Sequence, residues 1–247
     1  MRKVHIGTMG WSYDFWVGNF YPEGSGNLLT EYAKNFDTVE IDNTFYRIPS
    51  KDTVINWKEK TPDDFIFSAK FPRKITHIKK LQDCREELEV FIDHISLLGD
   101  KLGPMLLQLP WDFKPENFEV LKDFLSVLPE RYRFAVELRN KKWLDEKLYG
   151  LLRDHGVALV LIDHPWMPEM NTITADFTYI RWEGDRKKVN GRLGKMERDR
   201  SKEIIDWAGK IKGFMSDQVE VSGYFSKYYS GYPPGDVKML LGAINSP

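Results

Sequence analysis

Eight short runs of apolar and β-branched residues recur along the chain, and a longer stretch of helical periodicity follows most of them. The short runs cover residues 4–7, 38–42, 66–70, 105–109, 134–138, 157–162, 177–181 and 219–224. The amphipathic stretches cover residues 28–36, 52–60, 83–98, 115–128, 144–154, 200–214 and 237–243. Strands that alternate with helices indicate parallel βαβ units, and eight such units close a barrel. We therefore predict an α/β fold, a single (β/α)8 TIM-type barrel that occupies residues 1–247 as one domain.

One unit of this pattern is irregular. Residues 163–176 follow the sixth apolar run, contain two prolines and are too few for a full crossover helix. We therefore predict that the barrel is open or distorted after its sixth strand. Elsewhere the residues at the predicted helix ends are the expected ones, since Gly99 and Gly156 follow amphipathic stretches and Pro115 begins one.

The alternation of residues within each strand predicts which side chains point into the barrel. Val39 and Ile41 form the natural outward pair, which turns Glu40 and Asp42 inward. The same rule assigns to the interior Ser68, Lys70, Gln108, Glu137, Arg139, Tyr179, Arg181, Ser222 and Tyr224. Barrel interiors are normally filled with branched apolar side chains, so these charged positions require an explanation.

The charged positions fall at the carboxyl ends of their strands, which is the face where active sites of this architecture lie. Carboxylates beside lysine and arginine suit general acid–base catalysis, in which the cations hold an anionic group. We predict four catalytic residues, Glu40, Glu137, Lys70 and Asp163. Glu137 and Glu40 would act as acid and base. The alternative is a neutralised Glu–Arg–Lys network that only fixes the register of the strands.

Other side chains are predicted to bind the substrate. Arg139 and Arg181, with Lys70, would hold the anion, while Gln108 and Tyr224 would orient it. Six of the eight tryptophans follow or end a predicted strand, and flat indole faces suit sugar rings or unstacked bases. These six are Trp11, Trp16, Trp111, Trp143, Trp166 and Trp182. Trp11 would wall the pocket and Tyr13 lies in the same loop; the alternative is that these rings only pack the loops together.

Composition narrows the choice of ligand. The chain has 36 basic and 37 acidic side chains, a net charge of −1, which excludes a globally basic nucleic-acid coat but not a local basic patch. Residues 181–202 supply such a patch, with nine basic residues against four acidic ones. This segment is predicted to be either a mobile cationic lid over an anionic ligand or a solvated surface loop.

The sequence also limits the cofactors and the compartment. Cys84 is the only cysteine, which excludes an intrachain disulfide and a cysteine-rich zinc site. No glycine-rich nucleotide motif is present, so we predict no cofactor. Glu40, Glu137 and Asp163 could hold a divalent metal, although the interleaved cations favour a bound anion. Residues 1–7 lack a signal-like apolar segment and the longest aliphatic run has six residues, so we predict a cytoplasmic protein with no membrane partner.

Several motifs follow one another in a fixed order along nearly the whole chain. They are IGTMGWSY at residues 6–13, VEIDNTFYR at 39–47, FSAKFPR at 67–73, ITH at 75–77, QLP at 108–110, AVELR at 135–139 and YIR at 179–181. Together they resemble the signature of the YecE-like family, a domain family of unknown function. The resemblance implies a TIM-type barrel and adds five motif positions to the predicted substrate-binding set. These are Asn43, Tyr46, Arg73, His77 and Trp143.

The chain departs from the family pattern after the last strand. Ser226 and Lys227 stand where the family usually has two asparagines, which suggests a different or more anionic ligand. We predict an enzyme, of hydrolase or lyase/isomerase type, that applies acid–base chemistry to a small anionic, phosphorylated or sugar-like substrate. The alternatives are a nucleic-acid-binding protein or DNA-processing hydrolase, and a metabolite sensor without catalysis.

Overall fold

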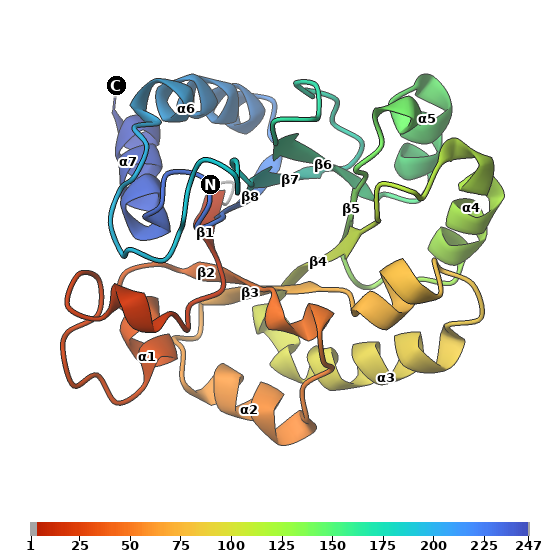
Figure 1. Ribbon diagram of the computed structural model, residues 1–247. Coiled ribbons are helices and arrows are strands. Elements are labelled where there is room, and N and C mark those ends of the chain that lie inside the picture. The colour runs from red at the N-terminus through yellow and green to blue at the C-terminus, as the bar shows by residue number, and fades with distance from the viewer. Residues whose placement is uncertain (1–3, 247) are drawn as a thin grey trace.

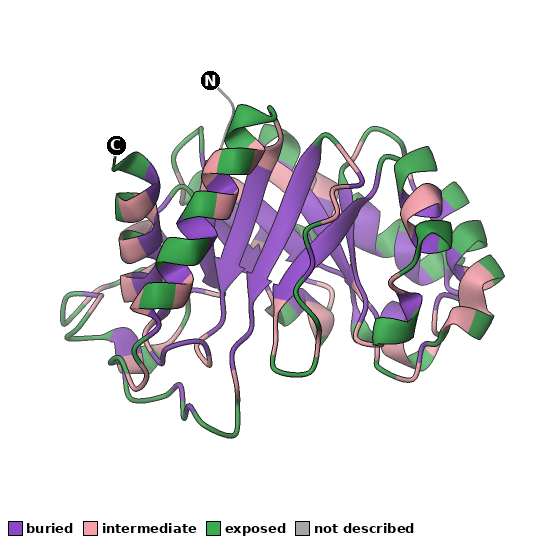
Figure 2. Cartoon of the chain, turned by 90° about the horizontal axis from the view of Figure 1, so that it is seen from above, coloured by how far each residue is buried: buried purple, intermediate pink, exposed green. Residues whose placement is uncertain are grey.

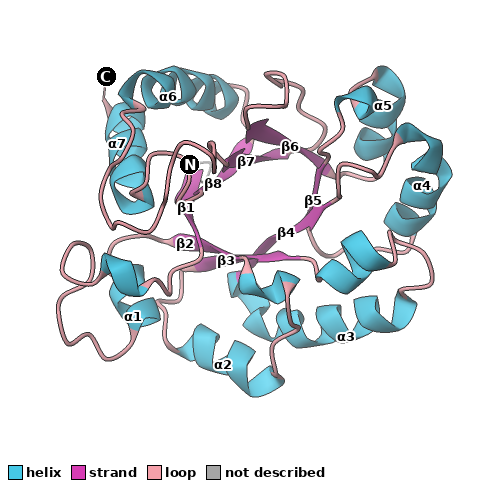
Figure 3. Cartoon of the chain, in the orientation of Figure 1, coloured by secondary structure: helices cyan, strands magenta, loops and turns pink. Residues whose placement is uncertain are grey.

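The computed structural model describes residues 4–246, in which eight parallel strands form a closed barrel with helices on its outside (Figures 1 and 3). The strands are β1 (Val4–Met9), β2 (Thr38–Ile41), β3 (Ile66–Lys70), β4 (Leu102–Gln108), β5 (Phe134–Glu137), β6 (Ala158–Asp163), β7 (Phe177–Trp182) and β8 (Glu220–Phe225). The helices are α1 (Leu28–Ala33), α2 (Lys51–Glu59), α3 (Arg85–Ile95), α4 (Phe118–Ser126), α5 (Glu146–Asp154), α6 (Ser201–Ser216) and α7 (Pro233–Asn245). The predicted α/β barrel is confirmed.

The closure of the barrel corrects one expectation. β1 pairs with β8 from Val4–Val221 to Thr8–Phe225, so the ring is complete. The segment between β6 and β7 contains no helix, as its length indicated. The sheet is nevertheless intact there, since β6 pairs with β7 from Val160–Tyr179 to Asp163–Trp182. The prediction of an open barrel was wrong because strand pairing needs only matched backbone groups and not a crossover helix.

Local signals fix where the helices begin and end. The side chain of Ser50 accepts a hydrogen bond from the backbone N–H of Thr53 and so caps α2, while Asp145 caps α5 through Leu148. Gly156 follows α5 with φ of +61°, a backbone conformation in which glycine has no steric penalty. α7 begins at Pro233, four residues before the predicted start, because proline fits the first turn of a helix.

The strands separate two apolar cores. Val39, Ile41 and Val136 belong to the large core between the barrel and its helices, whereas Leu106 and Val160 lie in a smaller core inside the barrel. Figure 2 shows the strands buried and the exposed residues concentrated on the outer faces of the helices. This division confirms the alternation of side chains inferred for β2 and β5.

The strand arrows in Figure 2 all point toward the end of the barrel that carries the longer loops, and we call this end the mouth. Within residues 4–246, no helix is long and apolar enough to span a bilayer. Residues 1–3 lie outside the described range. They belong to the segment 1–7, which the sequence analysis compared with a signal peptide.

Candidate active site at the barrel mouth

Arg181 on β7 is the centre of a buried ionic network just below the mouth. Its Nε and Nη2 donate to the two oxygens of Glu40 at 2.9 and 2.8 Å. Nη1 donates to Glu137 and to Glu183, both at 2.7 Å, and the remaining N–H points at the sulfur of Met9 at 3.2 Å. An arginine has five N–H donors, so all of them are used within the protein. Arg181 therefore has no donor left for an anionic ligand.

The two carboxylates predicted to act as acid and base are both fully buried in this network. Burial raises the pKa of Glu40 despite the attraction of Arg181, and the Tyr179 hydroxyl also donates to Glu40 at 2.7 Å. Burial also acts to raise the pKa of Glu137, but Arg139 and Arg181 outweigh it, so that this pKa is lowered. This arrangement is that of the register-fixing alternative, in which the charges neutralise one another.

A cavity of about 860 Å³ opens above this network at the mouth. Its lining residues come from the loops and strand ends of β2 to β7: Asp42, Phe45, Tyr46, Lys70, His77, Gln108, Pro110, Trp111, Arg139, His164, Pro165, Trp166, Met167, Glu183, Gly184, Asp185, Arg186 and Lys187. The volume falls within the range of pockets that enclose small molecules. The structure thus brings five of the predicted site residues into this lining, namely Lys70, Gln108, Arg139, Tyr46 and His77. Three more, Arg181, Glu40 and Glu137, lie beneath it.

Lys70 and Asp42 form an ion pair in the cavity. The Lys70 Nζ donates to Asp42 Oδ1 at 2.9 Å and lies 4.4 Å from the centre of the Phe45 ring. The Lys70 side chain is 9% exposed and that of Asp42 37% exposed. Although burial acts to raise it, the pKa of Asp42 is lowered by Lys70 and Arg181. Among the described residues Lys70 donates only this one hydrogen bond, so two of its three N–H groups remain for a ligand.

Arg139 links the cavity to the buried network. It donates through Nε to Glu137 and through Nη2 to Glu183 at 2.8 Å. Burial acts to raise the pKa of Glu183, but Arg181 and Arg139 hold it far below the usual range. Within residues 4–246 Arg139 donates only these two hydrogen bonds, which leaves three N–H groups at the edge of the cavity.

His77 adds a neutral imidazole to the same cavity. Burial, followed by the charges of Lys70 and Arg73, lowers its pKa to about 4. Its Nδ1 lies 2.9 Å from the Thr76 hydroxyl, and its ring packs against Phe45. The imidazole is therefore uncharged near neutral pH and is available as a hydrogen-bonding group.

The rim of the cavity is aromatic and basic. Tyr46, Trp111 and Trp166 are 78%, 72% and 74% exposed, although large rings are usually buried. The Lys187 ammonium lies 5.7 Å from the centre of the Trp166 ring. Exposed rings at the edge of a polar cavity offer flat apolar faces to a ligand.

Other predicted binding residues lie elsewhere. Trp11 packs edge-on against Trp57 in the outer core, and Trp143 stacks on Phe113 and donates to its carbonyl oxygen. Tyr224 lies deep inside the barrel, where its hydroxyl is 2.9 Å from that of Thr38. These positions follow from packing, since a large ring that can reach an apolar layer is stabilised by leaving water.

The three remaining binding candidates are also outside the lining of the cavity. The Tyr13 hydroxyl donates to the carbonyl oxygen of Met9 at 2.7 Å, and its ring packs on Trp16. Asn43 and Arg73 are exposed. Arg73 acts on the cavity only through its charge, which contributes to the lowered pKa of His77.

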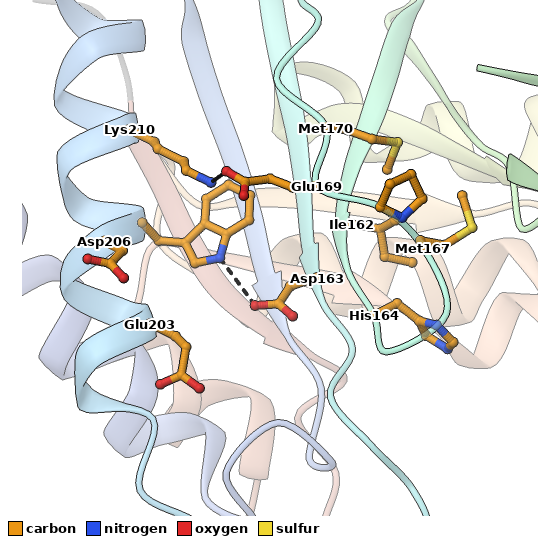
Figure 4. Close-up of a pocket in the computed structure, with 11 residues that line it drawn as sticks. Ile162, Asp163, His164, Met167, Glu169, Met170, Glu203, Asp206 and Lys210 are labelled. Atoms are coloured by element: carbon orange, nitrogen blue, oxygen red, sulfur yellow. Dashed lines mark hydrogen bonds and ion pairs between the residues drawn. The ribbon is translucent and has the colours of Figure 1, made fainter.

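Asp163 faces away from the barrel interior. Its Oδ2 accepts a hydrogen bond from Trp207 Nε1 on α6 at 3.2 Å (Figure 4). The same oxygen accepts a hydrogen bond from the Tyr229 hydroxyl at 3.3 Å. It lines a separate cavity of about 240 Å³ between the β6–β7 loop and α6. The alternation of β6 explains the correction, because Leu159 and Leu161 face the helices and Asp163 has the same parity. The proposed metal set is therefore not assembled, since Arg181 separates Glu40 from Glu137 and Asp163 lies outside.

The structure adds cavity residues that the sequence reasoning missed. The most important is Glu183, which pairs with Arg139 and Arg181. Its position could have been found by extending the alternation of Tyr179 and Arg181 by one step. His164 lies in a loop, where no periodic signal gives the direction of a side chain. Trp111 and Trp166, two of the tryptophans that the sequence places after strands, line the cavity from loops as well.

Residues 5–246 match the family model described as protein of unknown function DUF72. The chain belongs to this family. YecE from Escherichia coli K12 is 33% identical over 165 residues, which span 65% of this chain and 59% of YecE. YunF from Bacillus subtilis is 25% identical over 98% of this chain and 95% of its own length. The YecE-like resemblance is thus confirmed.

Solved structures of DUF72 proteins share the fold. The protein from Thermotoga maritima has a TM-score of 0.77 and 27% identity, covering 99% of this chain and 100% of its own. The protein from Enterococcus faecalis has a TM-score of 0.78 and 22% identity, covering 99% and 96%. A methyltransferase from Methanosarcina mazei, 10% identical with a TM-score of 0.53 over 99% of this chain and 93% of its own, shares only the barrel. DUF72 membership establishes the architecture and assigns no activity.

Proposed function

We propose that the mouth cavity is the active site of an enzyme that applies acid–base chemistry to a small anionic, phosphorylated or sugar-like substrate. The observation that carries this proposal is the Lys70–Asp42 pair, in which a carboxylate and an ammonium 2.9 Å apart face an open cavity. Arg139 lies in the same lining with N–H groups that the protein does not use. Such donors are what an anionic substrate requires.

Within this proposal each cavity residue has a distinct role. Asp42 serves as the base because it is the carboxylate beside Lys70 in the cavity lining and is ionised near neutral pH. Its lowered pKa makes it a weak base, so the proton that it removes must be an acidic one. Lys70 and Arg139 hold the anionic group, and Lys70 can also return a proton to the substrate. His77 and Gln108 orient polar groups of the substrate, while Trp111 and Trp166 face its apolar or ring portion.

Glu40 and Glu137 become positioning residues in this assignment. Both are fully buried, and Arg181 and Arg139 occupy their oxygens. Glu137 pairs directly with Arg139, which borders the cavity, and Glu40 holds Arg181 in the network beneath it. The effects of Glu137→Gln on turnover would therefore come with a loss of stability, whereas the effects of Asp42→Asn would not.

A thermal-shift screen tests the proposal. Wild type, Lys70→Met and the control Lys60→Met, an exposed lysine next to α2, are compared with sugar phosphates, sugar acids and short oligonucleotides. A ligand at about 100 times its dissociation constant adds ~2.7 kcal/mol to the stability of the folded state. We expect a small anion to stabilise wild type and Lys60→Met but not Lys70→Met. Equal stabilisation of all three proteins would contradict the proposal.

The screen is followed by a turnover assay with the ligands that bind. Loss of turnover in Asp42→Asn, with binding retained, supports the role of Asp42 as base. Tight binding with no product from any ligand in the wild-type protein would instead favour a metabolite sensor.

Nucleic-acid binding is a second candidate, and one observation favours it. The exposed indoles of Trp111 and Trp166 stand beside Arg186 and Lys187 at the rim, and ring stacking with basic side chains is how single strands are held. Stabilisation by oligonucleotides alone, fading as salt rises, would replace the small-molecule proposal.

A further inference from the structure

A second group of cations borders the mouth on the side of β8. It consists of Arg186, in the loop after β7, and Lys227, in the turn after β8, and we call it the β7–β8 cation pair. The Arg186 guanidinium lies 4.8 Å from the centre of the Tyr228 ring, and the Lys227 Nζ lies 5.4 Å from the same point. The two cations thus share one aromatic ring, and the charge of Arg186 acts on Lys227. Arg186 also lies 3.6 Å from the carboxylate of Glu183, which is already paired with Arg139 and Arg181.

The backbone holds these two segments together. Gly184 has φ of +70°, and a Cβ at this position would lie 2.1 Å from the carbonyl oxygen of Tyr228. The next residue, Asp185, donates its N–H to that same oxygen at 3.3 Å. In the turn after β8, the N–H of Tyr228 donates to the Ser226 hydroxyl at 3.2 Å. Only a glycine permits this approach, so the position of Lys227 beside the loop is built into the fold.

The rest of the loop is also tied down. The Glu197 carboxylate accepts the backbone N–H groups of Asn190 and Gly191 at 2.9 and 2.7 Å. A Cβ at Gly191 would lie 3.1 Å from the Lys227 side chain, so the chain passes directly over Lys227 and places Arg192 next to it. The backbone of the basic segment is therefore held by specific contacts, while the side chains of Arg186, Lys187, Lys188 and Arg192 are exposed.

The charge of Lys227 is not neutralised by an ion pair. Within residues 4–246, neither Lys227 nor Arg192 has a carboxylate at salt-bridge distance. Asp42 is the carboxylate that attracts Lys227, and Asp42 is already paired with Lys70. Burial, and then the charges of Arg192 and Arg186, lowers the pKa of Lys227. A half-buried ammonium that faces like charges is stabilised by a bound anion.

We propose that Arg186 and Lys227 form a subsite for a phosphate group of the ligand that occupies the mouth cavity. The inference rests on the proposed function, because Arg186 also lines that cavity and makes the two sites continuous. A phosphate dianion matches two neighbouring cations better than a carboxylate, which carries one charge. The loops after the seventh and eighth strands are also where barrels of this architecture often hold phosphate. Lys70 and Arg139 would then face the reacting end of the same molecule.

Calorimetric titration with inorganic phosphate at constant ionic strength tests the subsite. The proteins are wild type, Lys227→Met, Arg186→Met and the control Lys60→Met, which makes the same charge change on an exposed residue that the structure places outside both sites. We expect Lys227→Met to weaken phosphate binding about tenfold, as loss of one charge-assisted hydrogen bond predicts. Arg186→Met should weaken it as well, and Lys60→Met should bind like wild type.

Two outcomes would overturn the subsite. One is phosphate affinity in Lys227→Met equal to that of wild type, and the other is no binding by wild type. The same phosphate titration of Lys70→Met distinguishes a failure of the subsite from a failure of the proposed function. Phosphate binding that depends on Lys70 but not on Lys227 removes the subsite and leaves the mouth cavity as the anion site. The melting temperature of each variant establishes that it is folded before titration.

Discussion

Two clusters of the same charged residue types lie a few ångströms apart along the barrel axis and differ in what they leave unused. In the buried network, Arg181 donates all five of its N–H groups to protein atoms and its exposure is 1%. In the mouth cavity, Lys70 donates one hydrogen bond and Arg139 two, among the described residues, and both border open space. The difference teaches that a charged side chain at a strand end can bind a ligand only through hydrogen-bond donors that the protein has not already used.

The largest expected effect is on the stability of the network. Arg181→Met removes the cation that three buried carboxylates share, namely Glu40, Glu137 and Glu183. Breaking a buried ion pair by removing one partner costs about 3–5 kcal/mol, so the free energy of unfolding should fall by that amount. Urea denaturation provides the measurement.

Arg133 is the matched control for this change. It also contacts two carboxylates, Glu220 and Asp176, but its side chain is 43% exposed at the opposite end of the barrel. Arg133→Met should cost about 1 kcal/mol or less, because exposed ion pairs are screened by water. Equal costs for the two arginines would remove the distinction between a buried network and a surface pair.

The second effect is on ligand affinity. Lys70→Met should weaken the binding of an anionic ligand by about 10- to 100-fold, because a charge-assisted hydrogen bond is lost in a partly enclosed site. The unfolding free energy should change by only about 1 kcal/mol, because methionine fills the space of the buried Lys70 stem and Asp42, which is 37% exposed, remains in contact with water. A large loss of stability without a change in affinity would place Lys70 with the network.

The third and smaller effect concerns Asp163, whose loss should lower stability and leave ligand affinity unchanged, the reverse of the result for Lys70. Asp163→Ala removes the acceptor of hydrogen bonds from Trp207 and Tyr229 and should cost about 1–2 kcal/mol of stability. Ligand affinity should stay within about twofold of wild type, because this carboxylate faces α6. Loss of turnover in this variant would restore Asp163 to the catalytic set.

The smallest effect is the pH dependence from His77. Its pKa is lowered from 6.5 to about 4, so the unfolded chain binds more protons between these values. The stabilisation that His77 confers is therefore complete above pH 6.5 and is lost as the pH falls toward 4. His77→Gln should flatten the fall of the melting temperature in this window. Identical pH profiles for the variant and wild type would contradict the lowered pKa.

The sequence was sufficient for the fold and for the inward-facing strand residues. Both rest on local periodicity, which the alternation of Val39, Glu40 and Ile41 illustrates. The same rule, applied consistently, would have placed Glu183 inward and Asp163 outward. Glu183 lies beyond the predicted strand, which ends at residue 181, so the alternation was not extended to it. Asp163 was placed among the inward charges although it has the same parity as Leu159 and Leu161, which face the helices.

Whether a loop side chain is exposed or buried could not be predicted from the sequence, for a physical reason. Trp111 and Trp143 both follow a strand, yet one is 72% exposed and the other is buried against Phe113. Their difference depends on which distant segment packs on each ring, and the spacing of residues along the chain carries no such information. The number of N–H groups that Arg181 donates to protein atoms likewise depends on residues that are distant in the sequence, such as Glu40 and Glu137.

The most direct test of the separation between the two clusters combines stability with ligand binding. Wild type, Lys70→Met and Arg181→Lys are unfolded in urea with and without the small anion that stabilises wild type most in the screen. Lys70→Met should keep its unfolding free energy and lose the stabilisation by ligand. Arg181→Lys, which keeps the charge but not the planar fork, should lose stability and retain the gain from ligand. A ligand effect that disappears in Arg181→Lys and persists in Lys70→Met would contradict the assignment of the mouth cavity as the site.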